Sequence, residues 1–403
     1  MVGGREEDFS SFYQMNRPLK ILMVLHMPWD RNLGGSRVQL ELAEEFQTLG
    51  HEVEKFDYYD AFPQVSSSPL AKILLPNFAI KAKAFVQANA HRFDIIDAHQ
   101  GNLPFSKAEL GFQGLLVARS VGLYAFYEEF AKVADAKWPP RKMRTRLGNW
   151  VRSWQYKRRR LHFPRSLQTC ELINLPNSDE FAYVRDVMGL GDKCVVFPFG
   201  LSQQRQQAFA QAVQPTAVRL VNKQVVFIGS WGLRKGSRDW AKIIMRVKVQ
   251  LPEARFLFLG TGFSAKAVLE DLNLPASDWI EIIPRYDSKE LPRLLSRATV
   301  GAFPSYIEGF GFAVLEKLAC GLPTVVYDVP GPREVLRDLD ESLRVPVGDT
   351  EEFSSQVVRL LKLEEGHYSQ LSQRCVEVAQ LFSWSKIAKE TLAIYDKFLA
   401  SEK

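Results

Sequence analysis

The chain has 403 residues, 46% of them hydrophobic and 24% charged, which is typical of globular proteins and excludes a disordered or fibrous chain. The formal net charge of +6 is modest for this length and does not by itself indicate a nucleic-acid partner. The N-terminal residues contain no apolar stretch that would serve as a signal peptide, and no run of about 18 apolar residues occurs. We therefore expect a cytoplasmic protein without a spanning helix.

The four cysteines lie far apart and form no C-x-x-C pair. This spacing argues against a disulfide framework or a zinc site and fits a reducing cytosol. We expect Cys170, Cys194, Cys320 and Cys375 to be buried apolar thiols.

Short apolar runs alternate with helical patterns in the first half of the chain. Residues 1–18 form a polar tail, and residues 19–26 are typical of a buried strand. Val38, Leu42 and Phe46 then share one helix face. Such β–α–β alternation predicts a parallel sheet, here an N-terminal domain over 19–205. Further strands are expected at 51–56, 93–98, 114–119, 172–175 and 194–198, and Ser178 is expected to cap a helix.

A second series of strands and helices follows a segment rich in glutamine and alanine. We interpret that segment, 206–222, as a linker and 223–380 as a C-terminal domain. The final helix, 381–403, is expected to cross back to the N-terminal domain. The fold class is therefore α/β, with two Rossmann-like doubly wound domains facing a cleft, where ligands bind at the carboxyl ends of the strands. Strands are expected at 224–229, 255–260, 279–283, 300–303 and 323–327.

The string SYIEGFGFAVLEKLACGLPT carries two glutamates after a predicted strand. Gly309 and Gly311 allow close backbone approach, and the N–H groups of Gly311 and Phe312 at a helix start favour a phosphate. Glu308 lies in the loop and Glu316 about one turn inside the helix, where a carboxylate would suit the hydroxyls of a sugar or ribose. Taken alone, the two glutamates would more simply be surface charges.

The whole string resembles the E-x₇-E signature of the retaining GT-B glycosyltransferases of the glycogen-synthase-like and sucrose-synthase-like family, glycosyltransferase family 4 or group 1. The resemblance is strongest over 224–335, where Gly331-Pro-Arg-Glu334 also looks like the family pattern. It implies that Glu308 contacts the donor sugar, that Glu316 contacts the nucleotide ribose, and that Phe310 lies in the donor site. It implies no metal and no cofactor beyond a nucleotide-sugar co-substrate.

A second motif, FIGSWGLRKG, places two adjacent cations in a loop after a strand. A departing diphosphate requires fixed positive charge, and Arg234 and Lys235 are the candidates, with Gly229 at the strand end. A solvated Arg-Lys pair is the alternative. The resembling family carries an arginine near Ser230, so Lys235 is the safer assignment and Arg234 would supply that charge from a shifted position.

Three features of the first domain concern the donor phosphate and the acceptor. Gly34 and Gly35 follow the first strand, where backbone N–H groups can meet an anion, although a simple turn is the alternative. His99 lies at a strand's carboxyl end and is a candidate catalytic residue or a buried structural histidine. Residues 119–124 resemble a family segment that carries a histidine where this chain has Val121, which places a catalytic role at that position in doubt.

The region 136–170 has no acidic residue, and tryptophans interleave with its arginines and lysines. Cations with interfacial aromatics favour an anionic membrane surface, and the alternative is a solvated basic face whose tryptophans pack inward. We do not expect nucleic acid as a partner. The protein would then be cytoplasmic and peripheral to the inner membrane face.

We predict an enzyme that moves a sugar from a UDP- or GDP-linked donor to a glycan, lipid-linked or small-molecule acceptor, as in polysaccharide biosynthesis. The donor base depends on pocket walls near 285–290, where Arg285 is a donor-binding candidate. The alternatives are a nucleotide-sugar epimerase of the same fold and a non-catalytic scaffold subunit. A nicotinamide-dependent dehydrogenase is disfavoured because no G-x-G-x-x-G follows the first strand.

Overall fold

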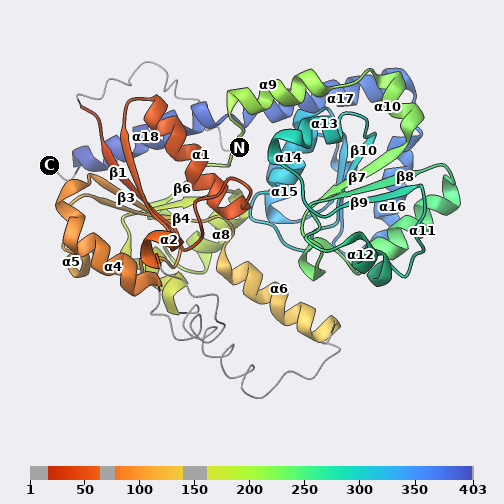
Figure 1. Cartoon of the computed structure of the whole chain (residues 1–403). Coiled ribbons are helices and arrows are strands. Elements are labelled where there is room, and N and C mark those ends of the chain that lie inside the picture. Colours follow the sequence, from red (N-terminus) through yellow and green to blue (C-terminus); the bar gives the residue numbers. More distant parts are fainter. Residues whose placement is uncertain (1–16, 64–77, 139–160, 402–403) are drawn as a thin grey trace.

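The computed structural model describes residues 17–63, 78–138 and 161–401, which form two α/β domains side by side (Figure 1). Each domain contains one six-stranded sheet, and all paired strands within the two sheets are parallel. The predicted class, two doubly wound α/β domains, is confirmed. Most of the predicted N-terminal tail lies outside the described residues.

The N-terminal sheet has the strand order β2-β1-β3-β4-β5-β6. Its central strands are buried on both faces, as expected for a parallel sheet covered by helices. The strands are β1 (Lys20–Val24), β2 (Glu52–Phe56), β3 (Ile95–His99), β4 (Leu115–Arg119), β5 (Leu172–Leu175) and β6 (Cys194–Val196). The helices are α1 (Gly34–Thr48), α2 (Tyr58–Ala61), α4 (Phe78–Asn89), α5 (Lys107–Leu110), α6 (Tyr124–Lys137) and α8 (Ser178–Asp186).

One local expectation is wrong. Helix α8 begins at Ser178, and its cap is Asn177, whose side chain accepts a hydrogen bond from the backbone N–H of Glu180. The hydroxyl of Ser178 instead donates to Glu334 across the domain interface. Asparagine is as good a cap as serine, so the sequence alone did not fix the first helical residue.

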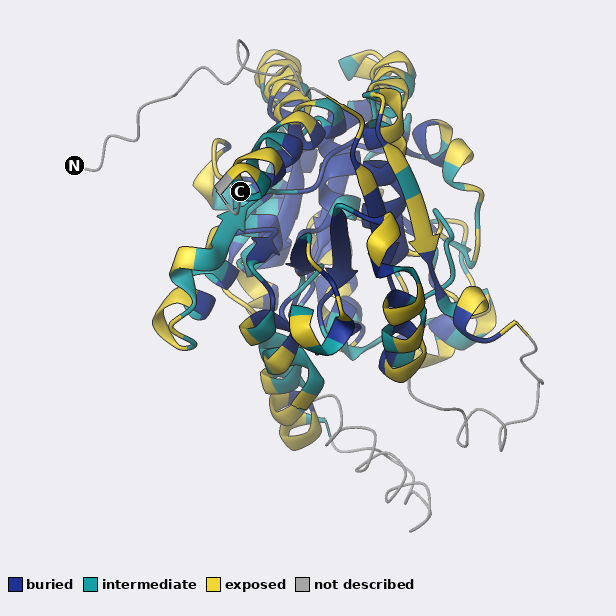
Figure 2. Ribbon diagram, turned by 90° about the vertical axis from the view of Figure 1, so that its left-hand side faces the viewer, coloured by how far each residue is buried: buried dark blue, intermediate teal, exposed yellow. Residues whose placement is uncertain are grey.

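The C-terminal sheet has the order β12-β11-β10-β7-β8-β9. Its strands are β7 (Gln224–Ile228), β8 (Arg255–Leu259), β9 (Ile280–Ile283), β10 (Val300–Phe303), β11 (Thr324–Tyr327) and β12 (Arg344–Val345). The helices are α11 (Trp240–Gln250), α12 (Ala265–Leu272), α13 (Leu291–Leu295), α14 (Phe312–Ala319), α15 (Pro330–Val335), α16 (Thr350–Leu361) and α17 (Glu365–Leu381), with a 3₁₀ turn, η4 (Leu233–Lys235), after β7. Figure 2 shows buried strands enclosed by helices with exposed outer faces.

The segment predicted as a linker is helical. Helices α9 (Gln203–Ala212) and α10 (Thr216–Asn222) lie against the C-terminal domain, where α9 contacts α13 and α14 and α10 contacts α17. Alanine and glutamine are good helix formers, and Pro215 separates the two helices. The chain between the two sheets is therefore packed structure that can contribute side chains to the domain interface.

Helix α18 (Trp384–Ser401) runs back over the N-terminal sheet and contacts α1 and β4 (Figure 1). The hydroxyl of Tyr395 donates to Asp97 Oδ2 at 2.6 Å and accepts from Arg119, which also donates to Asp97 at 2.6 Å. All three side chains are fully buried, so each depends on the other two for its hydrogen bonds.

The described residues contain no helix long and apolar enough to cross a membrane. Within the same ranges, no group of three His, Cys, Asp or Glu side chains could hold a metal ion. The four cysteines are free.

Candidate functional site

The loop that carries Glu308 joins β10 to α14 at the carboxyl end of the central strand. Gly311 precedes α14 with a φ of 95°, which an L side chain rarely adopts, and no side chain among the described residues caps this helix. The first turn of α14 also contains no acidic residue. The amino end of α14 therefore keeps the partial positive charge and the N–H groups that bind an anion.

Glu308 makes ion pairs with both predicted cations. Lys235 Nζ donates to Glu308 Oε2, and Arg234 Nη1 lies 3.6 Å from the same oxygen. Burial alone would raise the pKa of the Glu308 carboxyl, but the two cations outweigh burial and hold this pKa below its usual value. The carboxylate is therefore ionised at neutral pH and accepts hydrogen bonds.

The cations reach Glu308 because two loops of the C-terminal domain pack backbone against backbone. Gly236 has a φ of 75°, and a Cβ there would lie 2.2 Å from the carbonyl oxygen of Pro304. The N–H of Tyr306 donates to the carbonyl of Arg234 at 2.8 Å. The turn η4, which follows β7 and Gly229, is thereby fixed against the Glu308 loop.

Tyr127 of α6 extends into this group from the other domain. Its ring centroid lies 5.8 Å from the Arg234 guanidinium carbon, and its oxygen is hydrogen-bonded by that guanidinium and by the backbone N–H of Gly309. Burial raises the pKa of Tyr127, and the charge of Glu308 raises it further. The hydroxyl is therefore protonated at neutral pH and orients Arg234.

The two domains touch at the glycine after Glu308. A Cβ on Gly309 would lie 2.5 Å from Gly122 Cα, so this backbone contact requires glycine. Asn177 Nδ2 donates to the carbonyl of Gly309 at 2.6 Å. Asn177 in turn caps α8, whose Glu180 accepts hydrogen bonds from Ser120 Oγ at 2.6 Å and from the N–H of Leu123. The N-terminal domain thus holds the Glu308 loop through a buried polar network.

Glu316 accepts hydrogen bonds from two arginines that the sequence did not indicate. Arg37 Nη1 of α1 donates to Glu316 Oε1 at 2.7 Å, and Arg205 Nη2 of α9 donates to the same atom at 2.5 Å. Burial would raise the pKa of Glu316, but both arginines hold it below its usual value. Arg205 Nη1 also donates to the carbonyl of Ser288, which ties the 285–290 segment to Glu316.

His99 lies in the N-terminal domain with its protonation set by its neighbours. Asn102 Nδ2 donates to the carbonyls of His99 and Gln100, which identifies it as the amide nitrogen. Because an amide nitrogen can only donate, Nδ1 of His99 is the acceptor in the contact of 3.1 Å between them. The proton of a neutral His99 is then on Nε2, a buried atom without a partner among the described residues. Burial, followed by the neighbouring His26, lowers the pKa of His99 to about 3. His99 is thus a neutral donor, which does not suit the general-base role.

The remaining predicted residues lie in different environments. Gly34 and Gly35 form the first turn of α1, and a Cβ on Gly35 would lie 2.6 Å from the Met27 side chain. The ring of Phe310 packs against Phe199 in the core, so only its backbone faces the loop. Phe312 begins α14, while Arg285 is exposed on the segment after β9.

Sequence reasoning missed Arg37, Arg205, Tyr127 and Asn177. The sequence carried two signals for Arg37 alone. It lies two residues beyond Gly34-Gly35, and it stands in the first turn of a predicted helix, where acidic residues are favoured. The other three lie 107 to 182 residues from their C-terminal partners, and no local pattern brings them together.

Comparison with known proteins relates part of this chain to a family. Residues 222–363 match the family model described as Glycosyl transferases group 1. This segment of the chain is similar to the group 1 glycosyltransferases. A D-inositol 3-phosphate glycosyltransferase from Mycobacteroides abscessus is 30% identical over 39% of this chain and 36% of its own length. An N-acetyl-alpha-D-glucosaminyl L-malate synthase from Bacillus anthracis is 25% identical over 59% of this chain and 58% of its own. The matched segments thus span about a third to somewhat over half of these relatives.

Solved structures of the same fold cover nearly the whole of this chain. Sucrose-phosphate synthase from Thermosynechococcus elongatus superposes with a TM-score of 0.70 at 18% identity, over 95% of this chain and 100% of that one. Anabaena HepE, solved with UDP and glucose, superposes with a TM-score of 0.66 at 15% identity, over 94% and 100%. The predicted GT-B fold is confirmed.

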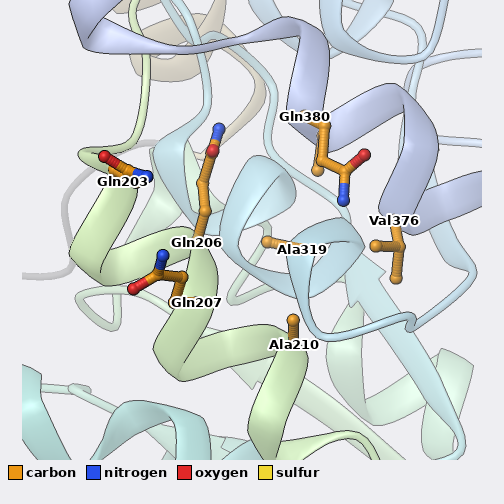
Figure 3. A pocket seen from close by; sticks show the side chains of 8 residues that line it. Gln203, Gln206, Gln207, Ala210, Ala319, Val376 and Gln380 are labelled. Carbon is orange, nitrogen blue, oxygen red and sulfur yellow. The ribbon is translucent and has the colours of Figure 1, made fainter.

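Two further surfaces of the protein lie outside the Glu308 site. A cavity of about 360 Å³ lies between α9, α17 and Ala319 at the carboxyl end of α14, the end opposite Glu308, and four glutamines line it (Figure 3). Residues 139–160 of the predicted basic region lie outside the described residues. Trp138, at its start, packs edge-on against Tyr306 at 5.1 Å and so contacts the C-terminal domain.

Proposed function

We propose that this chain is a retaining glycosyltransferase that moves a sugar from a UDP- or GDP-linked donor to an acceptor hydroxyl. The observation that carries the proposal is the buried Glu308 carboxylate paired with Lys235 and Arg234 beside the uncapped amino end of α14. Fixed cations and free N–H groups suit a diphosphate, and an ionised carboxylate suits sugar hydroxyls.

The proposed chemistry breaks the bond between the anomeric carbon and the diphosphate oxygen. Negative charge then develops on the leaving phosphate, and Lys235 and Arg234 stabilise it from fixed positions. Glu308 accepts hydrogen bonds from the donor sugar, and Glu316 presents its carboxylate to the ribose. The acceptor attacks from the face that the diphosphate leaves, and its proton passes to the leaving phosphate, so no protein nucleophile is required.

The acceptor side of the proposal rests on the carboxyl ends of β1 and β3. His26 and His99 stack there with ring centroids 5.4 Å apart, and Asn102 bonds to both rings. His99 Nε2–H is proposed to donate to a substrate oxygen. The names of two relatives refer to small hydroxylated anions, inositol phosphate and malate. Small polar acceptors therefore enter the test beside glycans and lipid-linked sugars.

The experiment combines donor binding with turnover. Thermal shift with UDP, GDP and ADP identifies the base, because a ligand of the native state raises the melting temperature. Release of the nucleoside diphosphate is then measured from the matching sugar donors, with and without acceptors, and the anomeric configuration of the product is read by NMR. Acceptor-dependent release with a retained configuration is expected.

Two substitutions test the residues that carry the proposal. Glu308→Ala and Lys235→Ala should abolish acceptor-dependent release while leaving the circular dichroism spectrum unchanged, because both side chains serve the cleft. Glu270→Ala and Lys242→Ala, on exposed positions of α12 and α11, are the matched controls and should retain activity. Full activity of either site variant would refute the assignment. Release or isomerisation without an acceptor would favour an epimerase, and donor binding without turnover a non-catalytic subunit.

A further inference from the structure

Arg37 stands at a position where a helix disfavours a cation. It lies in the first turn of α1, a helix of 15 residues that has no side-chain cap among the described residues and no acidic residue in that turn. The helix dipole makes this end partially positive, so an arginine there adds like charge. Such an accumulation is stable when an anion compensates it.

The bonds of Arg37 account for only part of its guanidinium. Nε donates to Glu41 Oε1 at 2.9 Å and Nη1 donates to Glu316 Oε1 at 2.7 Å. Nη2 is buried and has no partner among the described residues, although Arg37 as a whole is only 7% exposed. Leaving a buried donor of a charged group without a partner is destabilising. The two carboxylates therefore fix Arg37 in place and leave one nitrogen available.

Arg37 also lies at the predicted phosphate position. Its guanidinium carbon is 4.5 Å from the ring centroid of Phe312, the first residue of α14, and α14 is likewise uncapped within the described part of the chain. The amino ends of α1 and α14 thus converge from the two domains with Arg37 between them. Each contributes N–H groups and a dipole of the sign that attracts an anion.

We propose that Arg37 binds the donor diphosphate through Nη2, as a cation that the N-terminal domain supplies in addition to Lys235 and Arg234. Glu41 and Glu316 hold the guanidinium in the orientation for this contact. The diphosphate is then bound by both domains. The same arginine links it to Glu316, the carboxylate that is proposed to bind the ribose. This inference rests on the proposed function, because it specifies how the donor of that site is recognised.

The contact predicts a preference for nucleoside diphosphates over monophosphates that depends on Arg37. Binding of UDP, UMP, GDP and GMP to the full chain is measured by isothermal titration calorimetry for the wild type, Arg37→Gln and Arg37→Lys. In Arg37→Gln the dissociation constant of the preferred diphosphate should rise about tenfold or more, while that of the monophosphate changes by less than about threefold. Arg37→Lys keeps the charge without the planar fork and should restore part of the diphosphate affinity.

Arg31→Gln is the matched control. Arg31 also pairs with Glu41, at 3.1 Å, but its remaining bond is to the exposed Glu44 and it makes no bond to Glu316. Diphosphate binding by this variant should equal that of the wild type.

The outcomes separate this inference from the proposed function. A wild type that binds none of the four nucleotides contradicts the proposed function itself. A wild type that binds diphosphates, with Arg37→Gln binding them equally well, overturns the role of Arg37. A parallel loss of diphosphate and monophosphate affinity would also overturn it, because that result assigns Arg37 to holding the domains together. If Arg37→Gln does not fold, the test uses Arg37→Lys alone. A diphosphate affinity in Arg37→Lys equal to that of the wild type overturns the proposed contact between the guanidinium and the diphosphate.

Discussion

Replacing Glu180 by glutamine should change how the stability of the protein depends on pH. Glu180 is fully buried on α8 and accepts hydrogen bonds from Ser120, Leu123 and Asn177, and Asn177 also donates to Gly309 in the Glu308 loop. Burial raises the pKa of its carboxyl to about 7, and the hydrogen bonds offset burial only in part. No arginine or lysine among the described residues pairs with it.

The magnitude follows from the raised pKa. The folded protein holds the Glu180 proton to higher pH than the unfolded chain, so stability is greatest below pH 4.5 and falls as the pH rises through about 7. Each pH unit between the two pKa values corresponds to about 1.4 kcal/mol, so the full loss is about 3 kcal/mol. From about pH 5 to about pH 7.5 the wild type should lose about 2 kcal/mol through this group. Glutamine keeps an acceptor for Leu123 and carries no charge, so the loss should vanish in Glu180→Gln.

The assay is urea denaturation followed by circular dichroism at several pH values, with the difference in unfolding free energy between variant and wild type plotted against pH. The difference should grow in favour of the variant as the pH rises. Glu109→Gln is the control: this carboxylate also bonds to a backbone N–H and to Ser106, but those bonds lower its pKa, so its difference should stay flat in this range. A flat difference for Glu180→Gln would refute the reasoning.

Three further substitutions test contacts of the Glu308 site, of the domain interface and of the N-terminal core. In Gly309→Ala the new Cβ would lie 2.5 Å from Gly122 Cα, so the domains should separate. Small-angle scattering should then give a larger radius of gyration, and sugar transfer should fall at least about tenfold. Wild-type activity in this variant would contradict the close contact. Tyr127→Phe removes the hydroxyl that orients Arg234 and should lower kcat/KM about tenfold at an unchanged melting temperature; equal kinetics would dismiss that role. Tyr395→Phe takes one partner from the buried Asp97 and should cost about 1–3 kcal/mol in chemical denaturation, and a cost near zero would show that the pair is satisfied without it.

The strands and the motif loops were predictable because their signals are local. Buried parallel strands appear as short apolar runs, and β10 lies at Val300–Phe303 as the pattern indicated. The glutamine-rich segment was not predictable as packed helices, because its helical propensity is expressed only against α13, α14 and α17. Arg205, the last residue of the predicted N-terminal domain, lies on α9 at the edge of that segment and reaches Glu316 from there.

The same division holds for the chemistry of the site. Lys235 and Glu308 could both be proposed for one site because each follows a predicted strand of the C-terminal domain. Their ion pair follows from the strand order, in which β7 and β10 are neighbours. Arg37, Tyr127 and Asn177 could not, because their contacts with the C-terminal domain depend on how the two domains meet.

The sequence by itself predicted two α/β domains, the pair of glutamates after a strand and the loop with two cations, since strand periodicity and short motifs depend on neighbouring residues. The tertiary structure alone decided what surrounds those glutamates. Glu316 is held by Arg37 and Arg205, and Gly309 is held by Asn177, across separations of 279, 111 and 132 residues. Contacts at such separations arise only from domain packing, which no local pattern encodes.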